Sequence, residues 1–186
     1  MKTIIALATS LLVSSPVFVQ AAAMDDVKKA IFAGTSGIAD NMQGKVAELL
    51  SQRGWQANAQ GELMQGQCGV VPHKTEVLDL NGDGKKEVIL MVGNECSSGK
   101  IGQQVYLFSQ SADGKVERQL GFSASGYRVL KAKAEGAWPD LLFLGTGECQ
   151  PVWRHQAASG RYTFNHLYEA KPQACKVGQM QVHGNN

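Results

Sequence analysis

The sequence lacks several features that mark particular classes of protein. Its charges nearly balance, with 18 Lys and Arg residues against 16 Asp and Glu residues and a formal net charge of +2. A nearly neutral chain gives no electrostatic basis for binding nucleic acid or an acidic lipid surface. After residue 23, no apolar run approaches the roughly 20 residues that a membrane-spanning helix needs. We therefore expect neither a nucleic-acid partner nor a membrane span.

Catalytic signatures are also missing. The sequence contains no H-E-x-x-H, no G-x-S-x-G and no phosphate-binding loop, and its four histidines show no metal-ligand spacing. The best catalytic candidates are Glu95 and Glu148, since a pair of carboxylates about 5 to 10 Å apart serves glycosidases. We interpret both instead as strand-end residues beside disulfides, and we expect a protein that is not an enzyme.

The N-terminus has the pattern of a cleaved secretory signal. Residues 1–23 contain a lysine near the start, an apolar stretch from Ile4 to Val13 and three alanines at the end. A membrane anchor is the alternative, but the stretch is far shorter than the roughly 20 residues of a span. The leader holds one lysine and no acid, so its removal leaves 17 basic against 16 acidic residues. We expect a periplasmic protein that begins near Met24.

All four cysteines lie after this leader, and none of them forms the paired C-x2-C spacing of a zinc site. An even number of cysteines in an exported chain predicts two disulfides. Four cysteines allow three connectivities, and spacing alone does not select one. We favour Cys68–Cys96 with Cys149–Cys175, because each pair closes a short loop within one local unit.

Hydrophobic periodicity divides the mature chain into a helical segment, residues 24–60, and a β-domain, residues 61–186. Apolar residues recur at three- and four-residue steps from Ile38 to Leu50, and Gly54 follows as a stop. A shorter helix is predicted over Asp25–Phe32. The fold class is therefore α+β, with N-terminal helices packed on a mainly antiparallel sheet in one compact domain. Strands are predicted at residues 105–108, 129–131, 141–144 and 162–168, with glycine turns at 111–114 and 158–160.

Two segments of the β-domain resemble each other. Residues 87–96 and 140–149 each begin with an acid, continue through an apolar strand to glycine, and end in Glu-Cys after the same nine-residue step. Chance similarity between two short hairpins is the alternative, but the shared step favours a structural repeat. Two repeats are too few for a closed propeller, so we expect a propeller-like meander or a small sandwich capped by the helices.

Residues 79–87, DLNGDGKKE, have the composition of a metal loop. Oxygen-bearing side chains alternate along it, glycines occupy its fourth and sixth positions, and an apolar strand follows. A hard cation such as calcium takes six to eight oxygen ligands, and three carboxylates forced together without a cation would repel one another. The predicted ligands are the side chains of Asp79, Asn81, Asp83 and Glu87 and the carbonyl of Lys85.

This loop resembles the short calcium loop of FG-GAP and VCBS-type repeats, D-x-[DN]-x-[DN]-G-x-x-[DE]. It differs from the EF-hand loop, which needs Glu at position twelve, where this chain has Leu90. The resemblance implies one structural calcium ion between two strands. A metal-free Asn-Gly or Asp-Gly turn is the alternative.

The second repeat has lost most of these predicted ligands. Aligned on the nine-residue step, the four side-chain positions of the loop correspond to Ala132, Ala134, Gly136 and Asp140, so three of the four are missing. We expect a single calcium ion per chain. Trp138 lies in this stretch, and its indole is expected to pack where the first repeat has its ion.

A small exported domain without a catalytic constellation is most often a binding protein. The segments predicted to meet a partner are Ser97–Gln104 and Gly145–His155, and the predicted partner-binding residues are Glu148, Trp153, Arg154 and His155. Trp and Arg are enriched at interface hot spots, although Trp153 could equally be buried and Arg154 solvated. We expect a protein partner, and the leading hypothesis is a periplasmic inhibitor or immunity protein against a cell-wall hydrolase or a type VI secretion toxin. The alternatives are a glycan- or peptidoglycan-binding protein and, third, a hydrolase that uses Glu95 and Glu148.

Overall fold

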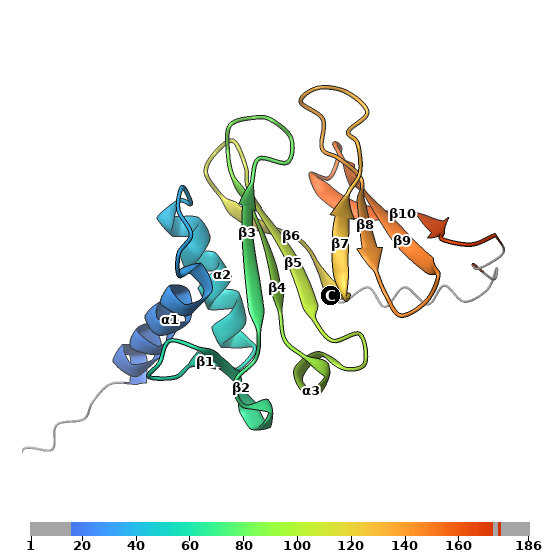
Figure 1. The fold of residues 1–186 in the computed structure, drawn as a ribbon. Coiled ribbons are helices and arrows are strands. Elements are labelled where there is room, and N and C mark those ends of the chain that lie inside the picture. Colours follow the sequence, from blue (N-terminus) through green and yellow to red (C-terminus); the bar gives the residue numbers. More distant parts are fainter. Residues whose placement is uncertain (1–15, 173–174, 176–186) are drawn as a thin grey trace, which may run out of the picture.

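The computed structural model describes residues 16–172 and Cys175. The described chain is mixed α+β and mainly β, with two N-terminal helices, a two-stranded ribbon and two four-stranded antiparallel sheets (Figure 1). This confirms the predicted class. Neither four-stranded sheet is part of a closed propeller in this part of the chain.

The two helices match the predicted periodicity with shifted bounds. Helix α1 spans Pro16–Phe32 and ends where expected, but it begins earlier than Asp25, inside the predicted leader. Helix α2 spans Asp40–Gln52 and buries Met42, Val46, Ala47 and Leu50 on one face. None of the described helices is both long and apolar enough to cross a membrane.

A short ribbon follows the helices. Strands β1 (Trp55–Ala57) and β2 (Leu63–Gln65) pair antiparallel, and the 3-10 turn Gly66–Cys68 comes next. The second helix therefore ends just before Gly54, the predicted stop, and the last residues of the predicted helical segment 24–60 belong to the ribbon. Trp55 and Leu63 are buried against the helices, so burial of their side chains favours the ribbon there.

The first four-stranded sheet has the order β3-β4-β5-β6. Helix α3 (Glu95–Ser98) lies between its second and third strands. The strands are β3 (His73–Leu78), β4 (Glu87–Val92), β5 (Gln104–Gln110) and β6 (Val116–Ser123).

The second sheet repeats this arrangement, with its strands hydrogen-bonded in the order β7-β8-β9-β10. The predicted strand at 129–131 was wrong in its bounds, because β7 ends at Val129. The two similar sequence segments begin at the second strand of each sheet, β4 and β8, so they occupy equivalent places. The strands are β7 (Gly126–Val129), β8 (Leu141–Leu144), β9 (Cys149–Gln156) and β10 (Arg161–Glu169).

Two hydrophobic cores hold these layers together. Val88, Leu90 and Val92 of β4 pack against the helices, whereas Ile89 of the same strand packs toward the second sheet. Alternate residues of a strand point to opposite faces, so β4 is buried on both sides and its sequence is continuously apolar. The layers therefore run from helices through the first sheet to the second sheet (Figure 1).

The meander topology gives the two sheets two distinct ends. The loops at residues 79–86, 111–115, 130–140 and 157–160 lie at one end, which we call the polar end. At least one residue from each of these loops lines the same pocket. The connections at 93–103 and 145–148 lie at the opposite end (Figure 1). We call this the disulfide end, because each connection borders a disulfide-bonded cysteine.

Candidate functional site

The predicted metal loop is the hairpin connection between β3 and β4. The strands pair in register up to Leu78 opposite Glu87, so the loop must reverse the chain over residues 79–86. Gly82 and Gly84 have φ values of 74° and 85°. Glycine enters this left-handed region without a steric penalty, which is why the reversal takes place at these two positions.

Side-chain oxygens of the loop turn inward and accept backbone hydrogen bonds. Asp79 Oδ2 accepts from the Gly84 N–H at 2.9 Å, and Asn81 Oδ1 accepts from the Asp83 N–H at 3.1 Å. Asp83 Oδ1 accepts from the Lys85 N–H at 2.8 Å. The other oxygen of Asp79, Oδ1, is buried without a hydrogen-bond partner. The loop therefore holds one orphaned carboxylate oxygen inside a ring of polar groups.

Glu87 closes the loop from the first position of β4. Its side chain is 1% exposed, and its Oε2 accepts from the Leu80 N–H at 2.7 Å. Burial, and then the nearby charges of Asp83 and Asp79, raise the pKa of Glu87 to about 7. No ion pair with a described residue offsets this carboxylate. The site therefore gathers negative charge for which the described protein provides no partner.

In the second sheet, an arginine balances the charge of the equivalent acid, Asp140. Arg154 Nε and Nη2 donate to the carboxylate of Asp140 at 2.9 and 2.6 Å. This hydrogen-bonded guanidinium lowers the pKa of Asp140. Leu141 pairs with Trp153 as Val88 pairs with Phe108, so Arg154 occupies the place that Ser109 has opposite Glu87. The first sheet thus has the uncharged Ser109 where the second sheet has the positively charged Arg154.

The loop residues fit a calcium ion by their chemistry. They offer three carboxylates, one amide oxygen and backbone carbonyls, the oxygen ligands that calcium takes. The orphaned Oδ1 of Asp79 and the uncompensated Glu87 are what a cation would satisfy. Within residues 16–172 and Cys175, no three Asp, Glu, His or Cys side chains already converge as a metal cluster. Binding would therefore replace the hydrogen bonds that now hold these oxygens.

A pocket of about 270 Å³ adjoins this loop at the polar end. Asn81, Asp83 and Lys85 form one wall, and Trp138 and His155 of the second sheet form the opposite one. The Trp138 and His155 rings stack with centroids 4.8 Å apart and planes inclined by 19°. Ser109, 5% exposed, and Gln119, 8% exposed, line the pocket between these walls.

The four predicted partner-binding residues do not form one exposed patch. Trp153 stacks on Phe122 between the sheets, with ring centroids 5.1 Å apart, and its Nε1 is buried without a partner. Arg154 holds Asp140, and His155 lines the polar-end pocket. Arg154 and His155 also line a neighbouring pocket together with Trp138 and Asp140. Glu148 is exposed at the disulfide end and pairs with Lys171.

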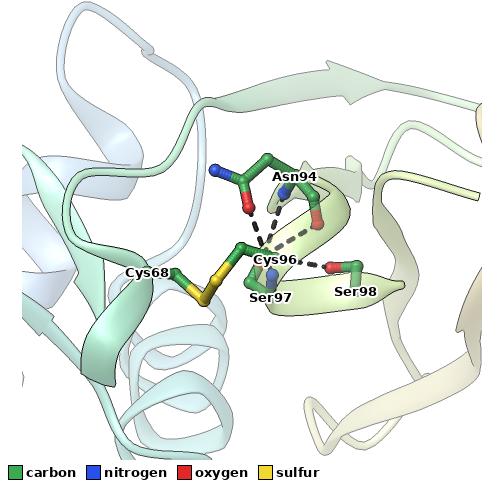
Figure 2. The surroundings of a disulfide bond; sticks show 5 residues. All are labelled: Cys68, Asn94, Cys96, Ser97 and Ser98. Atoms are coloured by element: carbon green, nitrogen blue, oxygen red, sulfur yellow. Dashed lines mark hydrogen bonds between the residues drawn. A yellow bond between two sulfur atoms is a disulfide. The ribbon is translucent and has the colours of Figure 1, made fainter. Parts of the chain in front are cut away.

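Glu95 and Glu148 both lie exposed at the disulfide end, and no ion pair or hydrogen bond joins them in the described chain. Glu95 opens helix α3, which is held by a capping box: the Asn94 N–H donates to Ser97 Oγ and the Ser97 N–H donates to Asn94 Oδ1. Figure 2 shows these bonds beside the disulfide between Cys68 and Cys96.

Both disulfides pair as favoured from the sequence, Cys68 with Cys96 and Cys149 with Cys175. The sequence reasoning did not identify Ser109 and Gln119 as pocket residues. Aligning the strands that follow the two repeats would have placed Ser109 opposite Glu87. Gln119 lies on β6, a polar strand without an apolar run, and no sequence pattern pointed to it.

Compared with protein-family models, curated protein sequences and solved structures, the chain matches none.

Proposed function

We propose that the protein is an exported, non-catalytic binding protein that holds its loops rigid with one structural calcium ion and two disulfides, and that its partner is a protein. A rigid loop loses less conformational entropy when it binds than a mobile one. Two disulfides and the absence of a membrane-spanning helix among the described residues are compatible with the periplasm or another extracellular compartment. The leader at residues 1–23, of which 1–15 lie outside the described residues, is part of the same proposal.

The calcium ion is assigned to the loop at residues 79–87. Its proposed ligands are the side chains of Asp79, Asn81, Asp83 and Glu87 and the carbonyl of Lys85. Support comes from the orphaned Asp79 oxygen, from the buried Glu87 without a counter-charge, and from the arginine that replaces a cation in the second sheet. The ion would order the loop, as the resemblance to FG-GAP and VCBS-type repeats implies.

The observation that carries the partner proposal is the construction of the disulfide end. Two connections lie there (Figure 1), and a disulfide fixes each of them. Figure 2 shows the first of these disulfides, Cys68–Cys96. Buried Gln150 further braces the second connection, since its Oε1 accepts from the Gly145 N–H at 2.6 Å and its Nε2 donates to the Gly147 carbonyl. Glu95 and Glu148 are exposed on this surface, and Glu148 pairs with Lys171.

Within this class, we propose inhibition of a cell-wall-degrading hydrolase, which includes immunity to a toxin delivered by type VI secretion. Such a role needs an exported, rigid surface and no catalytic group of its own. Glu95 and Glu148 suit the role as recognition residues, because acidic side chains can pair with basic residues of a partner.

Capture and inhibition together test this proposal. The exported protein, immobilised with calcium, should retain one protein from an envelope extract and slow peptidoglycan hydrolysis by that protein. Replacing Glu148 with Arg at the disulfide end should weaken both effects. Replacing exposed Glu135 with Arg at the polar end is the matched control and should leave them unchanged. Recovery of peptidoglycan alone would contradict a protein partner.

A further inference from the structure

The polar-end pocket is not used by the proposed protein partner, which binds at the opposite end of the sheets. Its walls come from both sheets, with Asn81 and Asp83 on one side and Trp138 and His155 on the other. At about 270 Å³, it is slightly smaller than the roughly 300–1,000 Å³ of pockets for drug-sized ligands. It has the size for one small ring rather than a large cofactor.

Gln119 supplies the observation that points to a ligand. Its side chain is 8% exposed and lines this pocket, and its Nε2 donates to Ser109 Oγ at 2.8 Å. Its Oε1 is buried and has no partner. Turning the amide over would give Ser109 the oxygen and leave the nitrogen without a partner instead. A hydroxyl group satisfies either orientation, because it both donates and accepts.

The opposite wall is aromatic and uncharged. Trp138 stacks on His155, and the edge of Tyr162 meets Trp138 with ring centroids 6.0 Å apart. Burial lowers the pKa of His155, so this ring stays neutral at pH 7. A neutral aromatic wall favours a ligand that has an apolar face as well as polar groups.

The charges of the lining give no strong attraction to an anionic ligand. Asp83 and Glu117 are acidic, and Glu117 pairs with Lys115 at 2.9 Å. The one lysine in the lining, Lys85, donates from Nζ to the Ser111 carbonyl at 2.9 Å. Glu117 is paired, and Asp83 is assigned to the proposed calcium ion, so the lining has no strong net charge of either sign. A neutral ligand rich in hydroxyl groups fits all of these features.

We propose that the polar-end pocket binds a neutral sugar ring of a glycan, with the ring's C–H face toward Trp138 and its hydroxyl groups toward Gln119 and Ser109. This site is separate from the proposed protein-binding surface, and neither proposal depends on the other.

Titration with sugars tests the proposal. We would titrate the whole exported protein, in the presence of calcium, with the N-acetylglucosamine trimer and with maltotriose, and follow heat and tryptophan fluorescence. Saturable binding of at least one trisaccharide is expected. Gln119→Met and Trp138→Ala should each weaken it about tenfold or more, which corresponds to about 1.4 kcal/mol. Lys100→Ala at the disulfide end is the matched control and should bind like the wild type.

Co-sedimentation with purified peptidoglycan separates two sources of this sugar chemistry. Sedimentation identifies the cell wall as the source, and trisaccharide binding without sedimentation identifies a soluble glycan; both support the pocket. If Trp138→Ala unfolds, Trp138→Phe keeps an aromatic wall and should retain part of the affinity, while Gln119→Met still tests the amide. Absence of binding to both trisaccharides, or unchanged affinity in a folded Gln119→Met variant, would overturn the proposal. Loss of protein capture at the disulfide end leaves this result unaffected, so the two proposals fail separately.

Discussion

Glu87 and Asp140 show how single residues decide the chemistry of the two sheets. Each acid precedes or opens the second strand of its sheet, and each is shielded from water. Asp140 pairs with Arg154 on the neighbouring strand β9, whereas Glu87 lies opposite Ser109 and near two other acids. A buried charge without a partner is costly, so the first sheet gains most from an added cation.

Calcium should therefore stabilise the protein through the 79–87 loop. At a calcium concentration one hundred times the dissociation constant, binding adds about 2.7 kcal/mol to the free energy of unfolding. For a domain of this size, this raises the melting temperature by about 5 to 10 °C. Thermal unfolding with calcium and with a chelator measures the shift, and calorimetry should give one ion per chain.

Asp83→Asn should remove most of this calcium-dependent shift, because it deletes one ligand charge. Glu135→Gln is the matched control: it deletes one acid from the corresponding loop of the second sheet and should keep the full shift. An equal melting temperature of the wild type with and without calcium, or binding of two equivalent ions, would contradict the single site.

His73 should make stability depend on pH. Its Nε2–H donates to the Ala30 carbonyl at 3.1 Å, and burial lowers its pKa below the ordinary 6.5. The unfolded chain therefore binds a proton below about pH 6.5 that the folded chain resists, so stability falls as the pH drops below that value. Burial also lowers the pKa of His155, which adds a change of the same sign.

Melting temperatures measured from pH 8 to pH 5 check this expectation. Glu87 acts in the opposite direction, because its raised pKa of about 7 makes protonation favour the folded state as the pH falls. The sign for His73 is therefore read from the difference between two proteins: below pH 6.5, His73→Gln should gain stability relative to the wild type. A variant that follows the wild-type curve at every pH would show that His73 does not contribute.

At the scale of elements, the turn into α3 depends on one glycine. Gly93 has a φ of 113°, and a Cβ placed there would lie 2.3 Å from Ser98 Oγ and 2.6 Å from Ser97 Oγ. Gly93→Ala should therefore cost about 1–3 kcal/mol through strain and displacement of the capping serines. Gly99→Ala is the control: its φ of 73° is strained too, but a Cβ there meets no atom within 4 Å. Urea unfolding should show the larger loss at residue 93.

The β8–β9 pair depends on the contact between Asp140 and Arg154. The side chains are 16% and 32% exposed, so removal of one partner leaves a half-buried group unpaired. Arg154→Met should lower the free energy of unfolding by about 1–3 kcal/mol. The double variant Asp140→Asn, Arg154→Gln keeps hydrogen-bonding groups without charge and should lose less. An equal loss in both proteins would show that the charge pairing does not matter.

Sequence patterns identified some of these elements better than others. The apolar strands β4 and β8 could be predicted because they are buried on both faces. In contrast, β6 contains Glu117, Arg118 and Gln119 and forms a strand because it pairs with β5. That pairing is a tertiary effect, which residue preference alone does not show.

At the scale of the whole molecule, two disulfides fix the loops of one end. They close loops of 28 and 26 residues, and each should stabilise the fold by about 3.5 kcal/mol in the chain-entropy account. Replacing both cysteines of either pair with serine should lower the melting temperature by about 7 to 14 °C. Differential scanning calorimetry of the two double-serine variants measures each contribution, and a shift below about 2 °C would contradict it.

The candidate site could be predicted only in part, because tertiary pairing of the strands is not visible in residue preferences. The metal loop is contiguous, so its oxygens could be recognised in the sequence. The pocket is lined by residues from both sheets, including β5 and β6 of the first sheet. Gln119 and Trp138 therefore meet only after the strands have paired. Trp153 and Arg154 were grouped with His155 as neighbours in sequence, but the alternation of β9 sends adjacent side chains to opposite faces.

The contrast between Ser109 and Arg154 has a consequence for when the protein matures. The second sheet contains its own positive charge, so its charge balance does not depend on calcium, although its Cys149–Cys175 disulfide needs an oxidising environment. In the proposed function, the first sheet obtains its positive charge by binding calcium from the medium. Its disulfide likewise forms only in an oxidising environment. The cytosol provides little free calcium and keeps thiols reduced. In the proposed function, the chain before export should therefore lack both its calcium ion and its disulfides, and it should be less stable than the exported protein.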